Sequence, residues 1–187
     1  MTTDFTALLT AIDAAVRPDD EPAAITARVK AGLEQLIQRG AVPLPGRFRQ
    51  PRPDGYARRL LHRDPAGRYT VVVMTWGAGQ GTPLHDHAGI WCVEGVVQGC
   101  MTVRQFDLVG DEGGACRFVE KGAVAAAVGS AGCLIPPFEY HTLANARSEE
   151  TSVTLHVYGG EMDHCHIFAP RPDGSYERQR RALSYTD

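Results

Sequence analysis

The residues with the clearest potential for chemistry are two histidines separated by one residue, His85 and His87. Side chains alternate between the two faces of a β-strand, so these imidazoles are expected to point one way and Asp86 the other. Two imidazoles on one side of a strand, joined by a third from a neighbouring strand, would form a facial metal site. Such a pair alone is weak evidence, so the flanking sequence decides its interpretation.

The spacing around this pair matches a known pattern. The stretch from Gly79 to Gly99 reads G-x5-H-x-H-x4-C-x6-G. It resembles the first cupin motif, G-x5-H-x-H-x3-4-E-x6-G, at every spacing. Cys92 stands where cupins usually carry a glutamate ligand.

A second motif follows in the expected order. Pro136, His141 and Asn145 resemble the cupin pattern P-x-G-x2-H-x3-N, with Phe138 in place of the glycine. Together the motifs predict a mainly β fold, a jelly-roll-like cupin barrel, in which His141 is the third imidazole.

The missing glutamate bears on the chemistry. A set of three neutral histidines leaves the full double positive charge on a divalent metal, so an anionic ligand such as a thiolate is favoured in the open positions. Cys92 could instead be a metal ligand itself.

Beyond the two motifs, the chain resembles the thiol dioxygenases, and cysteine dioxygenase type I in particular, from about Tyr56 to Tyr158. The segments that carry the resemblance are YARRLLHRD, WGAGQGTPLHDH, WCVEGVVQG and TLHVYGG, the last with Thr154 in place of a serine. The resemblance implies an enzyme that uses dioxygen and iron(II) to oxidise a small thiol. It implies iron ligands at His85, His87 and His141.

The same resemblance implies a substrate site. Arg58 is expected to bind the substrate carboxylate, with Tyr56 beside it, because arginine offers a bidentate fork that lysine does not. Tyr158 would be the active-site phenol and His156 its partner, since the two alternate on one strand and share a face. Cys92 matches the cysteine that forms a thioether with this tyrosine in mammalian enzymes; a small residue filling the pocket wall is the alternative.

Two residue choices bear on the substrate. Relatives specific for 3-mercaptopropionate typically carry glutamine at the position of Arg58, so arginine favours L-cysteine, with cysteine sulfinate as product. Gly159 and Gly160 replace the serine-proline step of the mammalian enzymes, which leaves 3-mercaptopropionate and mercaptosuccinate as alternatives. Other hypotheses are a zinc or manganese cupin isomerase or hydrolase, and a non-catalytic cupin that stores or senses a ligand.

The elements that must position these residues form a single expected domain over 1–187. Apolar residues at helical spacing predict two helices within 1–40, the second beginning near Pro22 and ending before Gly40. A proline-rich loop leads to a β-barrel over 56–170, and the charged tail 171–187 is expected to be solvated. The predicted strands are 57–62, 68–76, 90–98, 101–108, 116–120, 132–135, 140–145, 151–158 and 164–169.

Composition excludes several classes of function. A net charge of −3 gives no reason to expect nucleic acid or an anionic membrane as partner, and no apolar run is long enough to span a bilayer. The N-terminus lacks the features of a signal peptide, and the 5 cysteines include no CxxC pair. These features predict a cytoplasmic protein with reduced thiols, and they imply no protein partner.

Several residues have plainer interpretations. One of the adjacent Arg58 and Arg59 is expected to be solvated. His62, His164 and His166 are expected to be surface or structural residues.

Overall fold

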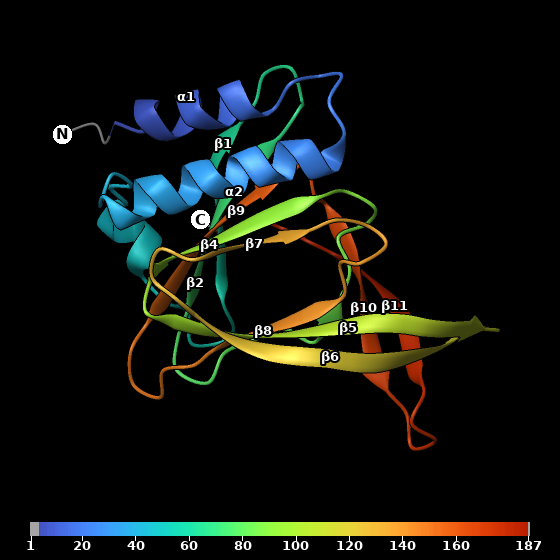
Figure 1. Cartoon of the computed structure of the whole chain (residues 1–187). Helices are drawn as coiled ribbons and strands as arrows, with labels where there is room; N and C mark the ends of the chain where they lie inside the picture. The colour runs from blue at the N-terminus through green and yellow to red at the C-terminus, as the bar shows by residue number, and fades with distance from the viewer. Residues whose placement is uncertain (1–3, 187) are drawn as a thin grey trace.

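Two N-terminal helices lie over one face of a β-sheet in the computed structural model, which describes residues 4–186 (Figure 1). Helix α1 spans Thr6–Ala15 and helix α2 spans Pro22–Gln38, followed by a short 3-10 turn at Gly46–Arg49. Proline at the first position of α2 fits a helix start, because its missing N–H would have no intrahelical partner there. The two predicted helices are confirmed. None of the helices within residues 4–186 is both long and apolar enough to cross a membrane.

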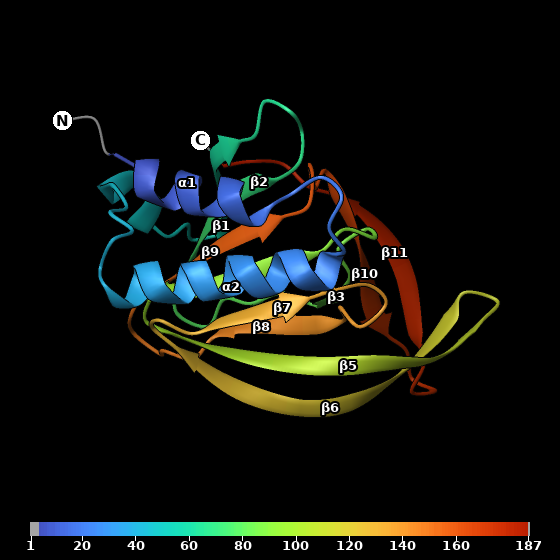
Figure 2. The same cartoon turned by 45° about the horizontal axis from the view of Figure 1, so that its top comes forward.

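The strands form two antiparallel sheets (Figures 1 and 2). The first has the order β1-β2-β9-β4-β7, and the second forms a closed ring in the order β10-β11-β6-β5-β8-β3. The strands of the first sheet are β1 (Ala57–Arg63), β2 (Thr70–Trp76), β4 (Cys92–Gln98), β7 (Ala131–Leu134) and β9 (Ser152–Tyr158). Those of the second are β3 (Leu84–His85), β5 (Cys100–Glu112), β6 (Ala115–Ala127), β8 (His141–Asn145), β10 (His164–Pro170) and β11 (Tyr176–Ala182). The predicted mainly β fold with two N-terminal helices is therefore confirmed.

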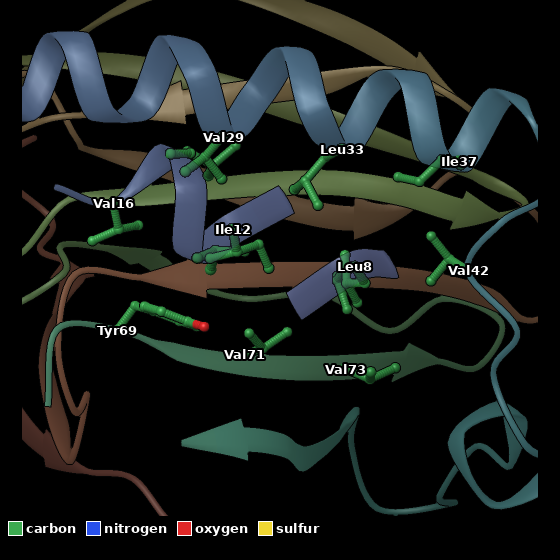
Figure 3. Close-up of a cluster of buried hydrophobic side chains, with 14 of the residues drawn as sticks. Leu8, Ile12, Val16, Val29, Leu33, Ile37, Val42, Tyr69, Val71 and Val73 are labelled. Carbon is green, nitrogen blue, oxygen red and sulfur yellow. The ribbon is translucent and has the colours of Figure 1, made fainter. Parts of the chain in front are cut away.

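Both faces of the first sheet are buried, and the alternation of side chains divides them. Val71 and Val73 of β2 pack with the helices in one apolar cluster, which Figure 3 shows in close-up. Val72 and Met74 face the opposite side and belong to a second cluster inside the barrel. Cys92 and Tyr158 lie in that second cluster, so β4 and β9 present chemically active residues to the barrel interior.

Glycine is required where the first motif begins and ends. Gly79 and Gly99 have φ values of 69° and 76°, in the left-handed region. A Cβ on Gly99 would also lie only 2.2 Å from the Ser152 hydroxyl oxygen. The motif glycines therefore serve the turns that bring β3 and β4 to the barrel interior.

The structure adds two strands to those expected, and both involve the second sheet. Strand β3 has only two residues, which is too short for a sequence pattern to reveal. Strand β11 lies in the tail that was expected to be solvated: its side chains are largely exposed, but its backbone pairs with β10 along its whole length. The tail thus lies on the surface with its charged side chains in solvent, but part of it is a strand that the sequence pattern did not predict.

Candidate active site

The three motif histidines converge inside the barrel. His85 of β3 lies opposite His141 of β8 in the strand register, and His87 follows two residues after His85. The ring centroid of His141 lies 4.4 Å from that of His85 and 5.0 Å from that of His87. One ring nitrogen from each of the three residues lies within 4.8 Å of the other two. The structure thus brings together the residues that the motifs singled out.

Hydrogen bonds leave the inner nitrogens of these rings free. His85 Nδ1 is 3.1 Å from the carbonyl oxygen of Pro83, and His141 Nδ1 is 2.9 Å from that of Glu139. A carbonyl accepts only from N–H, so both rings carry their proton on Nδ1 and present a lone pair at Nε2. His141 Nε2 and both nitrogens of His87 are buried without a hydrogen-bond partner among the described residues.

Buried nitrogens without hydrogen-bond partners are energetically unfavourable, and a bound divalent metal ion would satisfy them. Burial, with a contribution from His141, lowers the pKa of His85 to about 3, so its imidazole is neutral near pH 7. Burial likewise holds the pKa of His87 well below its ordinary value. In His141 burial acts in the same direction, but the neighbouring Glu94 outweighs it and raises the pKa, so a metal would have to displace a proton there. Neutral imidazole is the form that binds metal, and the buried nitrogens without partners among the described residues fit a metal ion.

Asp86 lies on the far side of this cluster, as alternation predicted. Its carboxylate accepts hydrogen bonds from the backbone N–H groups of Ala88 at 3.1 Å and His166 at 2.8 Å. Its second oxygen is 2.8 Å from His166 Nδ1. Asp86 therefore fixes the turn that carries His87, and His166 has a structural contact, as expected, rather than a place in the cluster.

A carboxylate that the motif comparison missed lies beside the histidines. Glu94 of β4 places Oε1 3.3 Å from His141 Nε2, 3.9 Å from His87 Nε2 and 3.2 Å from His156 Nδ1. Burial opposes its ionisation, but His141 and His156 together hold its pKa well below the ordinary value. The structure therefore places a carboxylate beside the three histidines, which the motif comparison did not predict. Side chains two residues apart on a strand share a face, so counting two residues on from Cys92 could have identified Glu94 from the sequence.

A second buried carboxylate, Glu139, lies on the other side of His87. One of its oxygens is 3.8 Å from His87 Nδ1 and has no hydrogen-bond partner among the described residues. Burial, followed by the nearby Asp86, raises the pKa of Glu139 to about 7. Glu139 falls at a variable position of the second motif, so the motif spacing carried no signal for it.

Strand β9 carries a chain of polar side chains along its inner face. The Trp76 indole N–H donates to the Thr154 hydroxyl at 2.9 Å, and that hydroxyl is 2.7 Å from His156 Nε2. His156 Nδ1 is 3.5 Å from the Tyr158 hydroxyl, longer than its 3.2 Å contact with Glu94. His156 and Tyr158 are thus neighbours as expected, but Glu94 shares His156 with the tyrosine.

Cys92 and Tyr158 lie directly opposite each other on β4 and β9. Both are buried, and burial raises the pKa of the thiol and of the phenol well above their ordinary values, so both are protonated at neutral pH. In Tyr158 the neighbouring Cys92 adds to this effect. The Cys92 sulfur also lies within 4.8 Å of ligand atoms of His87 and Glu94.

The two arginines of β1 are both buried, which corrects the expectation that one of them is solvated. The Arg59 guanidinium donates to the Thr75 hydroxyl at 3.3 Å, and that hydroxyl donates to the Phe48 carbonyl at 2.8 Å. Arg58 donates to the Met162 carbonyl at 2.8 Å, while its Nε has no hydrogen-bond partner among the described residues. Only Arg58 lines the same cavity as His85.

That cavity is narrow, about 20 Å³, and is lined by Tyr56, Arg58, His85, Tyr158 and others. The predicted substrate residues and one of the predicted metal ligands therefore share one space. Tyr56 stacks on Trp76 with ring centroids 4.5 Å apart.

The C-terminal segment closes one side of this cavity. The Tyr185 ring lies 4.6 Å from the Arg58 guanidinium carbon, and the Thr186 N–H donates to the Arg58 carbonyl at 2.6 Å. Leu183 lines the narrow cavity and also two larger outer pockets of about 240 and 270 Å³. Leu183 therefore lies between the metal-facing cavity and the outer pockets.

Comparison with known proteins gives this arrangement a family. The family model for cysteine dioxygenase type I matches residues 46–171, the range that contains the histidines, Arg58 and Tyr158. The chain belongs to the cysteine dioxygenase type I family. Curated relatives include cysteine dioxygenase type 1 of Rattus norvegicus, 25% identical over 116 residues, and of Homo sapiens, 26% identical over 119 residues. Each match covers 62% of this chain and 56% of the relative, so the chain spans about half the length of these relatives.

Solved structures give a partial likeness. A cupin-2 domain from Rhodospirillum rubrum is 16% identical with a TM-score of 0.48, over 64% of this chain and 68% of that one. A cupin 2 conserved barrel domain protein from Rhodopseudomonas palustris is 17% identical with a TM-score of 0.47, over 67% and 76%.

Proposed function

We propose that this member of the cysteine dioxygenase family is an iron(II)-dependent enzyme that oxidises L-cysteine to cysteine sulfinate with dioxygen. One observation carries the proposal: the cavity lined by Arg58 and Tyr158 is also lined by His85, a member of the three-histidine cluster. The other two histidines of that cluster have buried nitrogens without hydrogen-bond partners among the described residues. The reaction adds both oxygen atoms of dioxygen to the thiol sulfur. A cytoplasmic location stays a prediction.

Each residue has a proposed role. His85, His87 and His141 would hold iron(II), which when bound supplies a place for the thiolate sulfur and for dioxygen. The Arg58 guanidinium would bind and orient the substrate carboxylate, using the Nε–H that has no hydrogen-bond partner within residues 4–186. Tyr56 would form the wall beside it. The Tyr158 hydroxyl would donate a hydrogen bond to the bound substrate, oriented by His156.

A second candidate gains support from Glu94. The absence of a carboxylate argued against a zinc or manganese cupin isomerase or hydrolase, and a carboxylate is now found beside the histidines. The pairing of Arg58 with Tyr158 at the cavity still favours thiol oxidation.

Oxygen uptake with a panel of thiols, combined with metal analysis of the purified protein, tests the proposal. Iron-loaded protein is expected to consume one dioxygen per L-cysteine and to release the sulfinate. Faster turnover of 3-mercaptopropionate or mercaptosuccinate than of L-cysteine would make that thiol the preferred substrate. No oxygen uptake with any thiol after iron loading would contradict the proposal and favour the isomerase or hydrolase.

A thioether bond between Cys92 and Tyr158 is also expected to form slowly during turnover. The two residues are cross-strand partners beside the proposed iron site, and dioxygen is the oxidant that would remove one hydrogen from each. Peptide mass spectrometry after incubation with iron, cysteine and oxygen should find one fused peptide two hydrogens lighter than its parts. A Cys92→Ala variant is the control and should give only separate peptides. Separate peptides from the unsubstituted protein after many turnovers would show that Cys92 only fills the wall.

A further inference from the structure

A second cavity, of about 210 Å³, lies between the inner faces of the two sheets. Its mouth is at the β7 edge of the first sheet, whereas Arg58 belongs to β1 at the opposite edge. Within residues 4–186, β7 pairs only with β4, and residues 118–127 of β6 pair only with β5, so no ladder joins β7 to β6, which face each other in Figure 1. The exposed members of the lining mark this mouth: Gln105, Val124, Ala125 and Gly132.

Small and apolar side chains form the walls of this cavity. Cross-strand partners share a face of a sheet, so the register identifies the residues that point into it. Val103 of β5 lies opposite Val124 of β6 and Leu143 of β8. On the facing sheet, Glu94 lies opposite Gly132, which has no side chain to fill the space. Within residues 4–186, Glu94 is the one charged residue of the lining.

The inner end of the cavity reaches the histidine cluster. Glu94 and Leu143 line both this cavity and the narrow one beside Arg58, so these two side chains lie between them. Glu94 Oε1 is 3.3 Å from His141 Nε2. The cavity thus leads from an edge of the first sheet to the side of the cluster opposite the proposed substrate site.

The character of the two openings separates the molecules that they suit. Protein interiors are normally close-packed, and unfilled apolar volume lowers stability. An apolar cavity of this order stays dry and takes up small apolar molecules such as xenon. A charged amino acid thiol would lose its hydration there without compensation. Charged residues line the outer pockets on the other side, among them Asp54 and Arg58 in one and Arg181 in the other.

We propose that the cavity between β6 and β7 is a binding site for dioxygen and its route to the histidine cluster, separate from the route of the thiol. Dioxygen is small, uncharged and more soluble in apolar surroundings than in water, which matches these walls. The route rests on the proposed function, because it requires a reaction that consumes dioxygen. The binding site itself does not depend on that reaction.

Proton NMR of the metal-free protein under oxygen pressure tests the binding site without thiol or turnover. Dioxygen is paramagnetic, so it should speed the relaxation of the methyl groups of Val96 and Leu143, which line the cavity. Leu8 and Ile12 are at least as deeply buried, in the cluster beneath the helices, and serve as controls. We expect a severalfold larger effect at the cavity methyls. Equal effects at both pairs would overturn the proposal.

Gly132→Phe tests the route. No atom lies within 4 Å of the position that a Cβ would take at Gly132, and its φ is outside the left-handed region, so the ring can enter the mouth without backbone strain. The KM for dioxygen should rise severalfold while the KM for L-cysteine stays unchanged. The relaxation effect at Val96 and Leu143 should fall in the same variant.

Gly110→Phe is the matched control, because Gly110 also lies in a strand and is outside the cavity lining. A Cβ there meets Arg117 at an ordinary distance of 3.8 Å. This variant should change neither KM. If Gly132→Phe does not fold, Gly132→Val replaces it in the same measurements.

The other outcomes separate the two claims. An unchanged KM for dioxygen in a folded Gly132→Phe protein that has lost the relaxation effect would overturn the route. Displacement of dioxygen by micromolar octanoate would assign the cavity to a larger apolar ligand and overturn the proposal. No thiol oxidation, together with the expected relaxation effect, would reject the proposed function and the route and leave the binding site standing.

Discussion

His141→Ala is expected to lose nearly all bound iron and all sulfinate formation. The side chain is fully buried, and its Nε2 lies at the centre of the cluster, near Glu94 and the other imidazoles. Changes behind metal ligands already weaken binding roughly 10–100-fold, so removal of a ligand should exceed about 100-fold. Elemental analysis of the purified protein and oxygen uptake with cysteine measure the two losses.

His164→Ala is the control for that substitution. Its ring contacts Asp163 and is 30% exposed, away from the cluster, so iron content should stay at the unsubstituted level. Full iron occupancy in His141→Ala would refute the three-histidine site.

Arg58→Ala is expected to raise the KM for L-cysteine at least about tenfold, while the KM for cysteamine changes little. A charge-assisted hydrogen bond contributes about 1.5–3 kcal/mol, and about 1.4 kcal/mol corresponds to one decade in binding. Cysteamine has no carboxylate to bind the guanidinium. Steady-state oxygen uptake with both thiols gives the comparison.

Arg59→Ala serves as the matched control, because this neighbouring buried arginine contacts Thr75 rather than lining the cavity. Arg59→Ala should lower the stability of the protein but leave the ratio of the KM values for cysteine and cysteamine nearly unchanged. Equal losses for cysteine and cysteamine in Arg58→Ala would mean that Arg58 does not bind the carboxylate.

The parts of the site that sequence could predict are those fixed by short spacings. Glycines that must adopt positive φ and histidines at set distances from them identify the barrel and the cluster, because turn geometry leaves few alternatives. Glu94 was missed because a glutamate was sought at the position of Cys92. The structure places it two residues later, where alternation returns the side chain to the same face.

Other differences arise from tertiary packing, which local patterns do not encode. Adjacent arginines on a strand suggest one solvated side chain, but Arg58 faces the inner cavity and Arg59 contacts Thr75, and both are buried. The charged residues of β11 suggest a solvated tail, and their side chains do stay in water, but a strand at a barrel surface can still pair through its backbone. β6 extends to Ala127 because it pairs with β5, although its alanines have little intrinsic preference for strands.

The contact between Arg58 and Thr186 has a consequence for the order in which the chain can assemble. It joins residues 128 positions apart, one at the first strand and one beside the described C-terminal boundary. During synthesis the N-terminal part emerges first, so β3, β4, β8 and β9 leave the ribosome before Tyr185 and Thr186 do. A nascent chain can thus complete its histidine cluster while Arg58 still lacks its backbone partner and its aromatic neighbour. The chain can therefore bind metal before it can bind substrate. Tyr185 and Thr186, which follow later, complete the wall of the cavity beside Arg58.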